Sequence, residues 1–296
     1  MDSTQTTVLA NCPLCGTTAD SATPLATYAE LTWVRCPICD LIYKRSEAPD
    51  AGAVDFYEGG YFGTGDQGRR YTQRRARRIQ KSRNQILDVL NHVPGGPLLD
   101  IGCSMGYTLE AARSLGLPAT GADISEFAIR TCRELGFRAE KGVLGQMPFA
   151  AGEFDIVTMK HVLEHTPDPR SALRDVRRIL SPGGALFIAV PHGGNRKVRT
   201  QPQSYQYFVP SRHGREHFVY YTPATMTRML TDEGFAVRRV NPELLHRRAP
   251  ALRRLGETVA APFRAVGQVL TDVVQARKEF WLVAVKTGDG ASRSAA

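Results

Sequence analysis

The sequence predicts an α/β fold with a Rossmann-like open sheet, a small separate module before it and a helical insertion near its C-terminal end. Two observations carry this prediction. From residue 97 to 186, short apolar runs alternate with segments of helical periodicity, the pattern of parallel strands joined by helices. Before this region, two pairs of cysteines stand outside any such alternation. The 296 residues suffice for one full α/β core and a small second module.

The first module is predicted from two C-x2-C pairs, Cys12 with Cys15 and Cys36 with Cys39. Two such pairs place four thiolates at the corners of a tetrahedron, the arrangement that a structural zinc ion prefers. Disulfides are not expected, because no secretory signal opens the chain and a reducing compartment follows from that. A thioredoxin-like redox motif would need a βαβ pattern around one pair. We therefore expect a closed zinc ribbon over residues 8–45.

Residues 46–85 are predicted to form a linker and a helix. The glycines and aromatic residues of 54–71 suggest an ordered loop over a cleft. From Arg69 to Arg83 the chain carries eight basic residues and no acid, within a net charge of +9. Such a run either attracts polyanions, among them RNA and nucleotide-linked substrates, or forms a solvated helix face.

The central region reads as strands and helices in strict alternation. Asp168 caps the last of its helices and Pro169 occupies the first turn, whereas Cys132 is predicted to be a buried small residue in an earlier helix. Residues 236–240 and 280–286 resemble an antiparallel strand pair that closes the sheet. The predicted strands are 97–102, 118–125, 154–160 and 185–191, and the helices between them are 107–116, 125–136 and 168–184.

The turn after the first strand, "DIGCSMG", predicts the ligand. It fails the G-x-G-x-x-G pattern of a dinucleotide site but keeps glycines at 102 and 106. Asp100 offers a carboxylate that suits an ammonium group and repels a pyrophosphate. Asp123 ends the next strand, where a carboxylate can accept both hydroxyls of a ribose. A ligand with a ribose and an ammonium group but no phosphate is S-adenosylmethionine (SAM).

Residues 97–190 resemble the class I SAM-dependent methyltransferases of the ubiquinone-biosynthesis group. The resemblance rests on "LLDIGCSMG", "GADIS", "MPFAAGEFDIVTMKHVLEHTPDP" and "LSPGGALFIAVP", with "YYTPATMTRMLTDEGF" beyond them. It implies a seven-stranded methyltransferase sheet. It also implies a set of SAM-binding residues, which comprises Asp100, Gly102, Cys103, Gly106, Asp123, Ile124, Met147 and Lys160.

Two positions depart from the family pattern. Ser104 replaces the middle glycine of the loop, which is tolerated where the backbone keeps a negative φ. Val143 stands where an aspartate often meets the adenine amine, so that backbone or Gln146 would meet it instead. The resemblance therefore supports the site as a whole more than each adenine contact.

The acceptor side is expected after the third and fourth strands. His161 is nearest the expected methyl position, and similar proteins place a histidine like His217 facing the pocket, with Tyr221 close by. A histidine base suits proton removal from a hydroxyl or an activated carbon near neutral pH. Glu164 and His165 are interpreted as anchors of the turn that follows the third strand. The chain lacks the (N/D)PP(Y/F) motif of exocyclic-amine methylases and any cysteine after Cys132 for 5-methylcytosine chemistry.

The C-terminal insertion, residues 246–279, carries one apolar stripe at spacings of three and four. It is interpreted as a helix or helix pair packed on its own domain, with a lid, a dimer face or a peripheral membrane contact as alternatives. Residues 288–296 are predicted to be a disordered tail. The remaining domain, 86–287, is the methyltransferase unit. No apolar run is long enough to span a bilayer, and with no secretory signal visible a cytoplasmic protein is expected. The expected oligomeric state is a monomer or a homodimer.

The leading interpretation is O- or C-methylation of a small-molecule, sugar or natural-product acceptor, which includes phosphorylated and nucleotide-linked ones. A zinc ribbon with a tyrosine-rich linker resembles methyltransferases of sugar and natural-product pathways. The first alternative is an RNA methyltransferase that grips the backbone with the ribbon and the basic helix. The second is a SAM-binding regulator without turnover.

Overall fold

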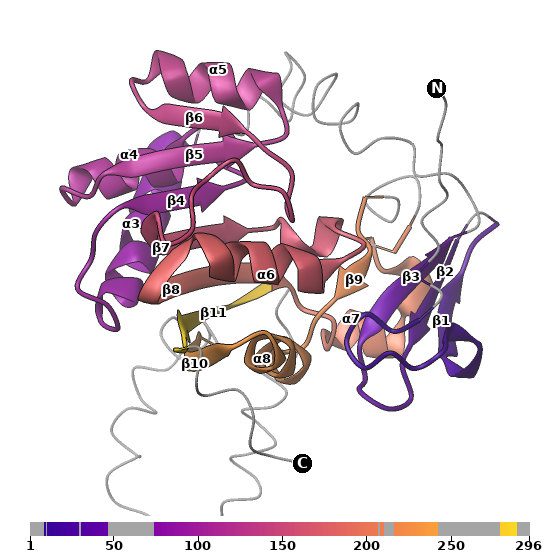
Figure 1. The fold of residues 1–296 in the computed structure, drawn as a ribbon. Helices are drawn as coiled ribbons and strands as arrows, with labels where there is room; N and C mark the ends of the chain where they lie inside the picture. Colours follow the sequence, from indigo (N-terminus) through magenta and orange to yellow (C-terminus); the bar gives the residue numbers. More distant parts are fainter. Residues whose placement is uncertain are drawn as a thin grey trace, which may run out of the picture.

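The computed structural model describes residues 9, 11–29, 31–46, 74–206, 208–209, 216–241 and 279–288. The aromatic segment 54–71, the insertion up to residue 278 and the tail after Gly288 lie outside the described residues, and the predictions for them stay predictions. The described part contains two sheets, one of seven strands and one of four. In Figure 1 the smaller sheet lies beside the larger one.

The larger sheet confirms the predicted Rossmann-like architecture, with the order β10-β11-β8-β7-β4-β5-β6. The inner strands pair in parallel, and β11 pairs antiparallel with both β8 and β10. The strands are β4 (Leu98–Ile101), β5 (Ala119–Asp123), β6 (Arg138–Lys141), β7 (Phe154–Lys160), β8 (Leu180–Pro191), β10 (Phe235–Asn241) and β11 (Glu279–Lys286).

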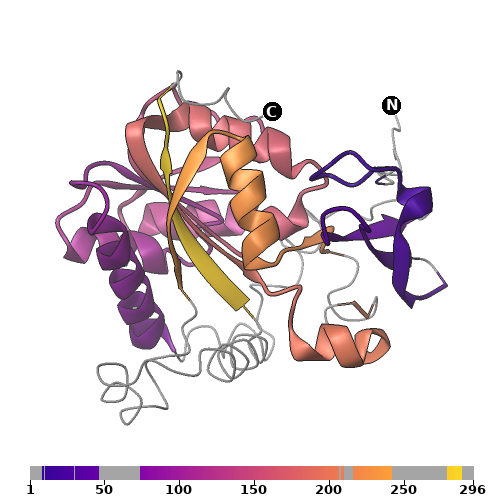
Figure 2. The same ribbon diagram turned by 90° about the horizontal axis from the view of Figure 1, so that it is seen from below.

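Helices cover both faces of this sheet, because the buried parallel strands are apolar on both sides. On one face α3 and α4 pack on a cluster that includes Phe187 and Trp281, and on the other α6 and α8 pack on a larger cluster. Figures 1 and 2 show these layers from two directions. The helices are α3 (Arg75–Leu90), α4 (Tyr107–Ser114), α5 (Glu126–Glu134), α6 (Pro169–Ile179), α7 (Arg196–Thr200) and α8 (Pro223–Asp232).

Local sequence signals explain where these helices begin. Asp168 accepts a hydrogen bond from the Ser171 amide at the start of α6, as predicted from the Asp-Pro pair. Thr222 caps α8 through a reciprocal pair of bonds with Thr225. Cys132, predicted to be buried, is a fully buried residue of α5. The boundary predicted between residues 85 and 86 falls inside the continuous helix α3.

The smaller sheet has the order β1-β2-β3-β9 and is antiparallel throughout. Its first three strands come from the N-terminal module: β1 (Thr23–Thr27), β2 (Leu31–Arg35) and β3 (Ile42–Ser46). Its fourth, β9 (Val219–Tyr220), comes from the segment between β8 and α8. One face joins the core of the large sheet, and the other packs Trp33 against Phe208 and Tyr220. The N-terminal module is therefore built into the larger domain.

Candidate functional site

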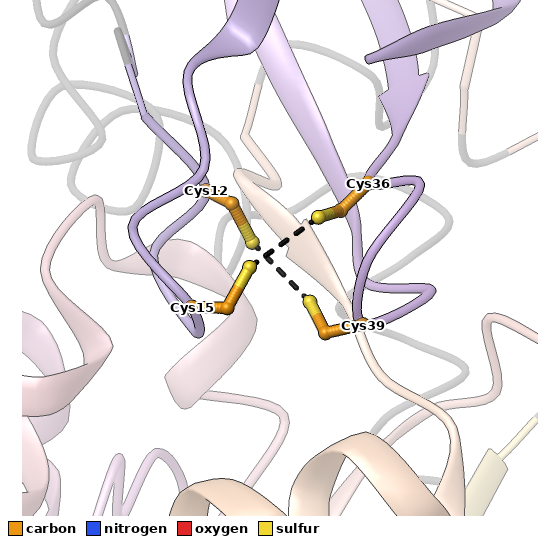
Figure 3. A group of neighbouring side chains, drawn as sticks. All are labelled: Cys12, Cys15, Cys36 and Cys39. Atoms are coloured by element: carbon orange, nitrogen blue, oxygen red, sulfur yellow. Dashed lines mark hydrogen bonds between the residues drawn. The ribbon is translucent and has the colours of Figure 1, made fainter. Parts of the chain in front are cut away.

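The four cysteines of the two C-x2-C pairs converge on one point, as Figure 3 shows. The Sγ atoms of Cys12 and Cys39 are 3.4 Å apart, and so are those of Cys15 and Cys36. Four sulfurs bound tetrahedrally to zinc at ~2.3 Å lie about 3.8 Å from one another. All four cysteines are free thiols, and all four sulfurs lie within 4.8 Å of one another. The donor set and its shape fit a closed divalent-metal site.

The pKa values of three of the clustered thiols also favour binding of a cation. Burial raises the pKa of Cys12 to about 11 and raises that of Cys39 as well. Burial acts in the same direction on Cys15, but hydrogen bonds with Thr17 outweigh it and lower its pKa to about 6. The crowded thiols therefore oppose a full set of thiolates on their own, whereas a divalent cation would supply the compensating charge.

Arg170 on α6 holds the first cysteine pair against the large domain. Its Nε donates to the carbonyl of Pro13 at 3.1 Å, and its Nη2 donates to that of Leu14. The same guanidinium pairs with Asp232 and Glu233 at the end of α8. One side chain thus joins the loop between Cys12 and Cys15 to two helices.

Replacing Arg170 with alanine is expected to lower the free energy of unfolding by about 1–3 kcal/mol, because several charge-assisted hydrogen bonds are lost at a partly solvated site. Urea denaturation measures this change. Arg174→Ala is the matched control, since Arg174 is 59% exposed and meets Glu233 only at 3.6 Å. Equal loss in the two variants would contradict the role given to Arg170.

The loop after β4 has the backbone geometry of a close ligand approach. Gly102 has a φ of +73°. A Cβ at this position would come within 2.5 Å of the Val162 side chain. The Ser104 amide donates to Asp123 Oδ2 and the Ser125 amide donates to Asp123 Oδ1, both at 3.0 Å. Asp123 therefore fixes the loop. It also lines a cavity that Gly102 and Ser104 line as well.

The condition under which a serine at position 104 is readily tolerated, a negative φ, is not met, since the structure gives Ser104 a φ of +49°. The position retains the left-handed backbone that glycine adopts most easily, and the amide bond to Asp123 helps to hold it there. Its Oγ is buried without a partner in the described structure.

Ser104→Gly is therefore expected to be more stable than Ser104→Ala by about 1 kcal/mol, since only the alanine keeps the Cβ that disfavours a left-handed backbone. Thermal or urea unfolding of the two variants tests the difference. The reverse order of stability would show that the loop does not retain this conformation in solution.

Beneath the loop, Asp100 and Lys160 form a buried polar network. Thr158 donates to Asp100 Oδ1, and the Lys160 ammonium donates to Thr108 and to Ser82, the latter at 3.0 Å. Burial raises the pKa of Asp100 and lowers that of Lys160, and each opposes this effect on the other through its charge. The network supports the cavity floor from β4, β7, α3 and α4.

A single cavity of about 670 Å³ brings most of the predicted SAM-binding residues together. Gly106 is the exception, because it lies outside the lining and forms the N-cap of α4 with a φ of +74°. The predicted residues that do line the cavity are Asp100, Gly102, Cys103, Asp123, Ile124, Met147 and Lys160. Val143 and Leu144 line the cavity beside Met147.

His161 lines the cavity, and both of its ring nitrogens face carboxylates. Its Nδ1 is 3.2 Å from Glu164 Oε1 and its Nε2 is 2.9 Å from Glu279 Oε2. Removal from water lowers its pKa, but the two carboxylates outweigh this and raise it to about 10. Carboxylates therefore engage both ring nitrogens, and a role of His161 as a base or an acceptor contact stays a prediction.

Of the two other predicted catalytic residues, His217 lines the cavity and Tyr221 does not. Tyr221 is fully buried in the core, and burial raises the pKa of its phenol well above the usual range. Tyr221 follows β9 and does not line the cavity, so its position does not support the predicted role toward the acceptor, which stays a prediction. The His217 Nδ1 is hydrogen-bonded to the Tyr220 hydroxyl.

Glu164, His165 and His217 form a cluster that the sequence interpretation missed. One potential ligand atom from each lies within 4.8 Å of the others, and all three residues line the cavity. Glu164 and His165 were interpreted as anchors of the turn. The "LEH" motif was visible in the sequence, but no local signal placed His217 beside it.

A family model described as a methyltransferase domain matches residues 71–240, more than half of the chain. This chain belongs to that family. It is a SAM-dependent methyltransferase, and SAM is its methyl donor. The match includes the loop after β4, the carboxylate at the end of β5 and the whole segment from β7 to α8.

Both curated relatives and solved structures are similar to this methyltransferase. The ubiquinone biosynthesis O-methyltransferase of Thiobacillus denitrificans is 28% identical over 53% of this chain and 71% of its own length. That of Methylococcus capsulatus is 34% identical over 38% of this chain and 50% of its own length. A chain from the complex of the Haloferax volcanii Trm112 methyltransferase activator with a methyltransferase aligns with a TM-score of 0.51. It is 19% identical and covers 73% of this chain and 95% of its own, so it shows the fold alone.

The four-cysteine module lies outside the family match. The family match begins at residue 71, after the four-cysteine module. None of the helices in the described ranges combines the length and the apolar character that crossing a bilayer requires.

Proposed function

We propose that this methyltransferase transfers the methyl group of SAM to an oxygen atom of a small-molecule acceptor. The observation that carries the proposal is that the SAM-side and acceptor-side residues line the same cavity of about 670 Å³. Cavities of 300–1,000 Å³ suit small ligands, and here SAM must share the space with its acceptor. This favours a compact acceptor over a folded nucleic acid.

Each part of the cavity has a separate proposed task. Asp123 accepts the ribose hydroxyls, while the loop from Gly102 to Ser104 approaches the methionine part. Asp100 supplies negative charge below the ammonium group. These assignments rest on the carboxylates and the left-handed loop, both of which are present in the cavity wall.

The reaction needs little covalent help from the protein, because SAM carries its own electrophile. A lone pair of the acceptor oxygen forms the new O–C bond as the C–S bond breaks and its electrons return to sulfur. The hydroxyl proton leaves to water. The protein accelerates this step by alignment of oxygen, carbon and sulfur and by polar groups that assist loss of the hydroxyl proton.

Oxygen is proposed as the acceptor atom for two reasons. The similar curated proteins are named O-methyltransferases. The acceptor-side lining also offers Glu164, His165 and His217, which are polar groups that can meet a hydroxyl. The charged lining includes both Arg78 with Lys81 and several carboxylates, so phosphorylation of the acceptor stays a prediction.

The test is methyl transfer from labelled SAM into a cell extract, followed by separation into RNA, lipid, glycan and small-molecule pools. Label in the small-molecule pool, stable to mild acid as an ether is, supports the proposal. Label in RNA would overturn it and would make the basic helix α3 the surface to map. Label in an amine would retain the enzyme class and reject the oxygen acceptor.

A further inference from the structure

We propose that Glu164, His165 and His217 form a second metal site, which binds one divalent first-row transition-metal ion inside the cavity. One carboxylate and two imidazoles are the donors, and one ligand atom from each lies within 4.8 Å of the others. With metal–ligand bonds of ~2.0–2.2 Å, small side-chain rotations bring such a set to coordination distance. This site is separate from the four cysteines, because it draws on η2 (Leu163–His165) and the segment before β9.

The second carboxylate oxygen of Glu164 is the strongest indication of a metal ligand. The side chain is fully buried. Its Oε1 meets His161 Nδ1 at 3.2 Å, while its buried Oε2 has no hydrogen-bond partner in the described structure. A buried carboxylate oxygen without a partner is costly, and coordination of a metal ion is one of the few arrangements that compensates it.

The two histidines are oriented as metal ligands usually are. The His165 Nδ1 is 3.1 Å from the Glu216 carbonyl oxygen, to which it donates as an N–H. The His217 Nδ1 is bonded to the Tyr220 hydroxyl. The carbonyl fixes the Nδ1–H tautomer of His165, whose Nε2 is then its ligating nitrogen, and the Tyr220 hydroxyl can accept from the Nδ1–H of His217 when that ring ligates through Nε2. Support of one ring nitrogen by a carbonyl or other polar group is the common outer shell of metal-binding histidines.

The backbone fixes the two halves of the site to each other. The Phe218 amide, next to His217, donates to the Glu164 carbonyl at 2.7 Å. The Lys44 amide of β3 donates in turn to the Phe218 carbonyl at 2.8 Å. The His165 and His217 rings meet edge to face with centroids 4.5 Å apart. Ligands from distant segments are therefore held in place before an ion arrives.

The donor set points to the class of metal. Two imidazoles and one carboxylate suit Mn²⁺, Fe²⁺, Co²⁺ or Zn²⁺, whereas Ca²⁺ and Mg²⁺ prefer oxygen ligands throughout. Three protein ligands leave coordination positions for an acceptor oxygen. A bound ion would lower the pKa of an acceptor hydroxyl and orient it. This role in catalysis rests on the proposed function, but binding of the ion does not.

Electron paramagnetic resonance of Mn²⁺ tests the site, with full-length protein whose cysteine cluster has first been loaded with zinc. Mn²⁺ is the chosen probe because it favours nitrogen and oxygen ligands over thiolates. We expect one bound Mn²⁺ per wild-type chain, and at least tenfold weaker binding in Glu164→Gln and in His217→Gln. His192→Gln is the matched control, because His192 is a buried histidine outside the cluster and should leave Mn²⁺ binding unchanged.

Three outcomes would overturn the metal site: no saturable Mn²⁺ binding, unchanged binding in both ligand variants, or equal loss in the control. Calorimetric SAM binding by each variant separates a lost ligand from a lost fold, and a variant that no longer binds SAM is replaced by His165→Asn. Saturable Mn²⁺ binding without methyl transfer to any hydroxyl would keep the site and reject its role toward the acceptor. Methyl transfer that is unaffected by Mn²⁺ occupancy would do the same.

Discussion

Cys36→Ser is expected to abolish metal binding at the four-cysteine cluster and to remove most methyl transfer to the acceptor, while the protein still binds SAM. Wild-type protein should carry one zinc ion per chain at this cluster. Structural zinc sites contribute folding energy directly, with apparent values of about 10–16 kcal/mol in isolated zinc-finger peptides at neutral pH. Loss of one thiolate leaves three ligands, and burial of Cys12 and Cys39 opposes their deprotonation without the ion, so the N-terminal module should unfold locally.

The effect should reach the acceptor side because β3 and β9 share a sheet. Ile42 and Tyr43 pair with Tyr220 and Val219, which stand three and two residues after His217. Without the module, β9 loses its partner strand, and His217 loses the backbone support that places it in the cavity. The SAM side depends on β4, β5 and their loops, which make no strand pairs with the small sheet.

Metal content, SAM affinity by calorimetry and methyl transfer to the identified acceptor would be measured on the same preparation. Cys132→Ala serves as control for metal content, since Cys132 is a fully buried thiol outside the cluster. We expect at least a tenfold fall in kcat/KM for Cys36→Ser with a change of less than threefold in the Kd for SAM. Full methyl transfer by a zinc-free variant would show that the module does not support the site.

The central fold could be predicted because its signals are local. Buried parallel strands appear as continuous apolar runs, and the turn after each strand carries its own glycine or acid. The glycine loop and Asp123 are therefore visible as neighbours of strand ends. The paired cysteines are visible for the same reason, since each pair spans only three peptide bonds.

The structure departs from the sequence interpretation where contacts between distant segments determine the local structure. Nothing near residues 219–220 signals that they form an edge strand with β3, so the burial of Tyr221, the next residue, was not predictable. The state of His161 depends on Glu279, which is 118 residues away. Ser104 takes a left-handed backbone because Asp123 accepts its amide, a contact across 19 residues.

Asp123→Asn is expected to raise the Kd for SAM by about 10–100-fold, which corresponds to roughly 1.4–2.8 kcal/mol of binding free energy. The carboxylate now accepts the amides of Ser104 and Ser125 through its two oxygens. The asparagine of equal size keeps one acceptor, and its NH2 group would face a backbone N–H of the loop. The same change removes the negative charge proposed to bind the ribose hydroxyls, and hydrogen bonds to a charged group are worth more than neutral ones.

Isothermal titration of SAM measures this effect, and Glu126→Gln provides the control. Glu126 follows the same strand three residues later, but its side chain is 58% exposed and pairs with Lys141 at 3.3 Å on the surface. We expect its Kd for SAM to stay within twofold of the wild type. Because loop order and ribose binding both depend on Asp123, Asp123→Asn should also lower the melting temperature before SAM is added. A variant with a wild-type Kd would mean that the ribose is held elsewhere. The proposed orientation of SAM in the cavity would then have to be reversed.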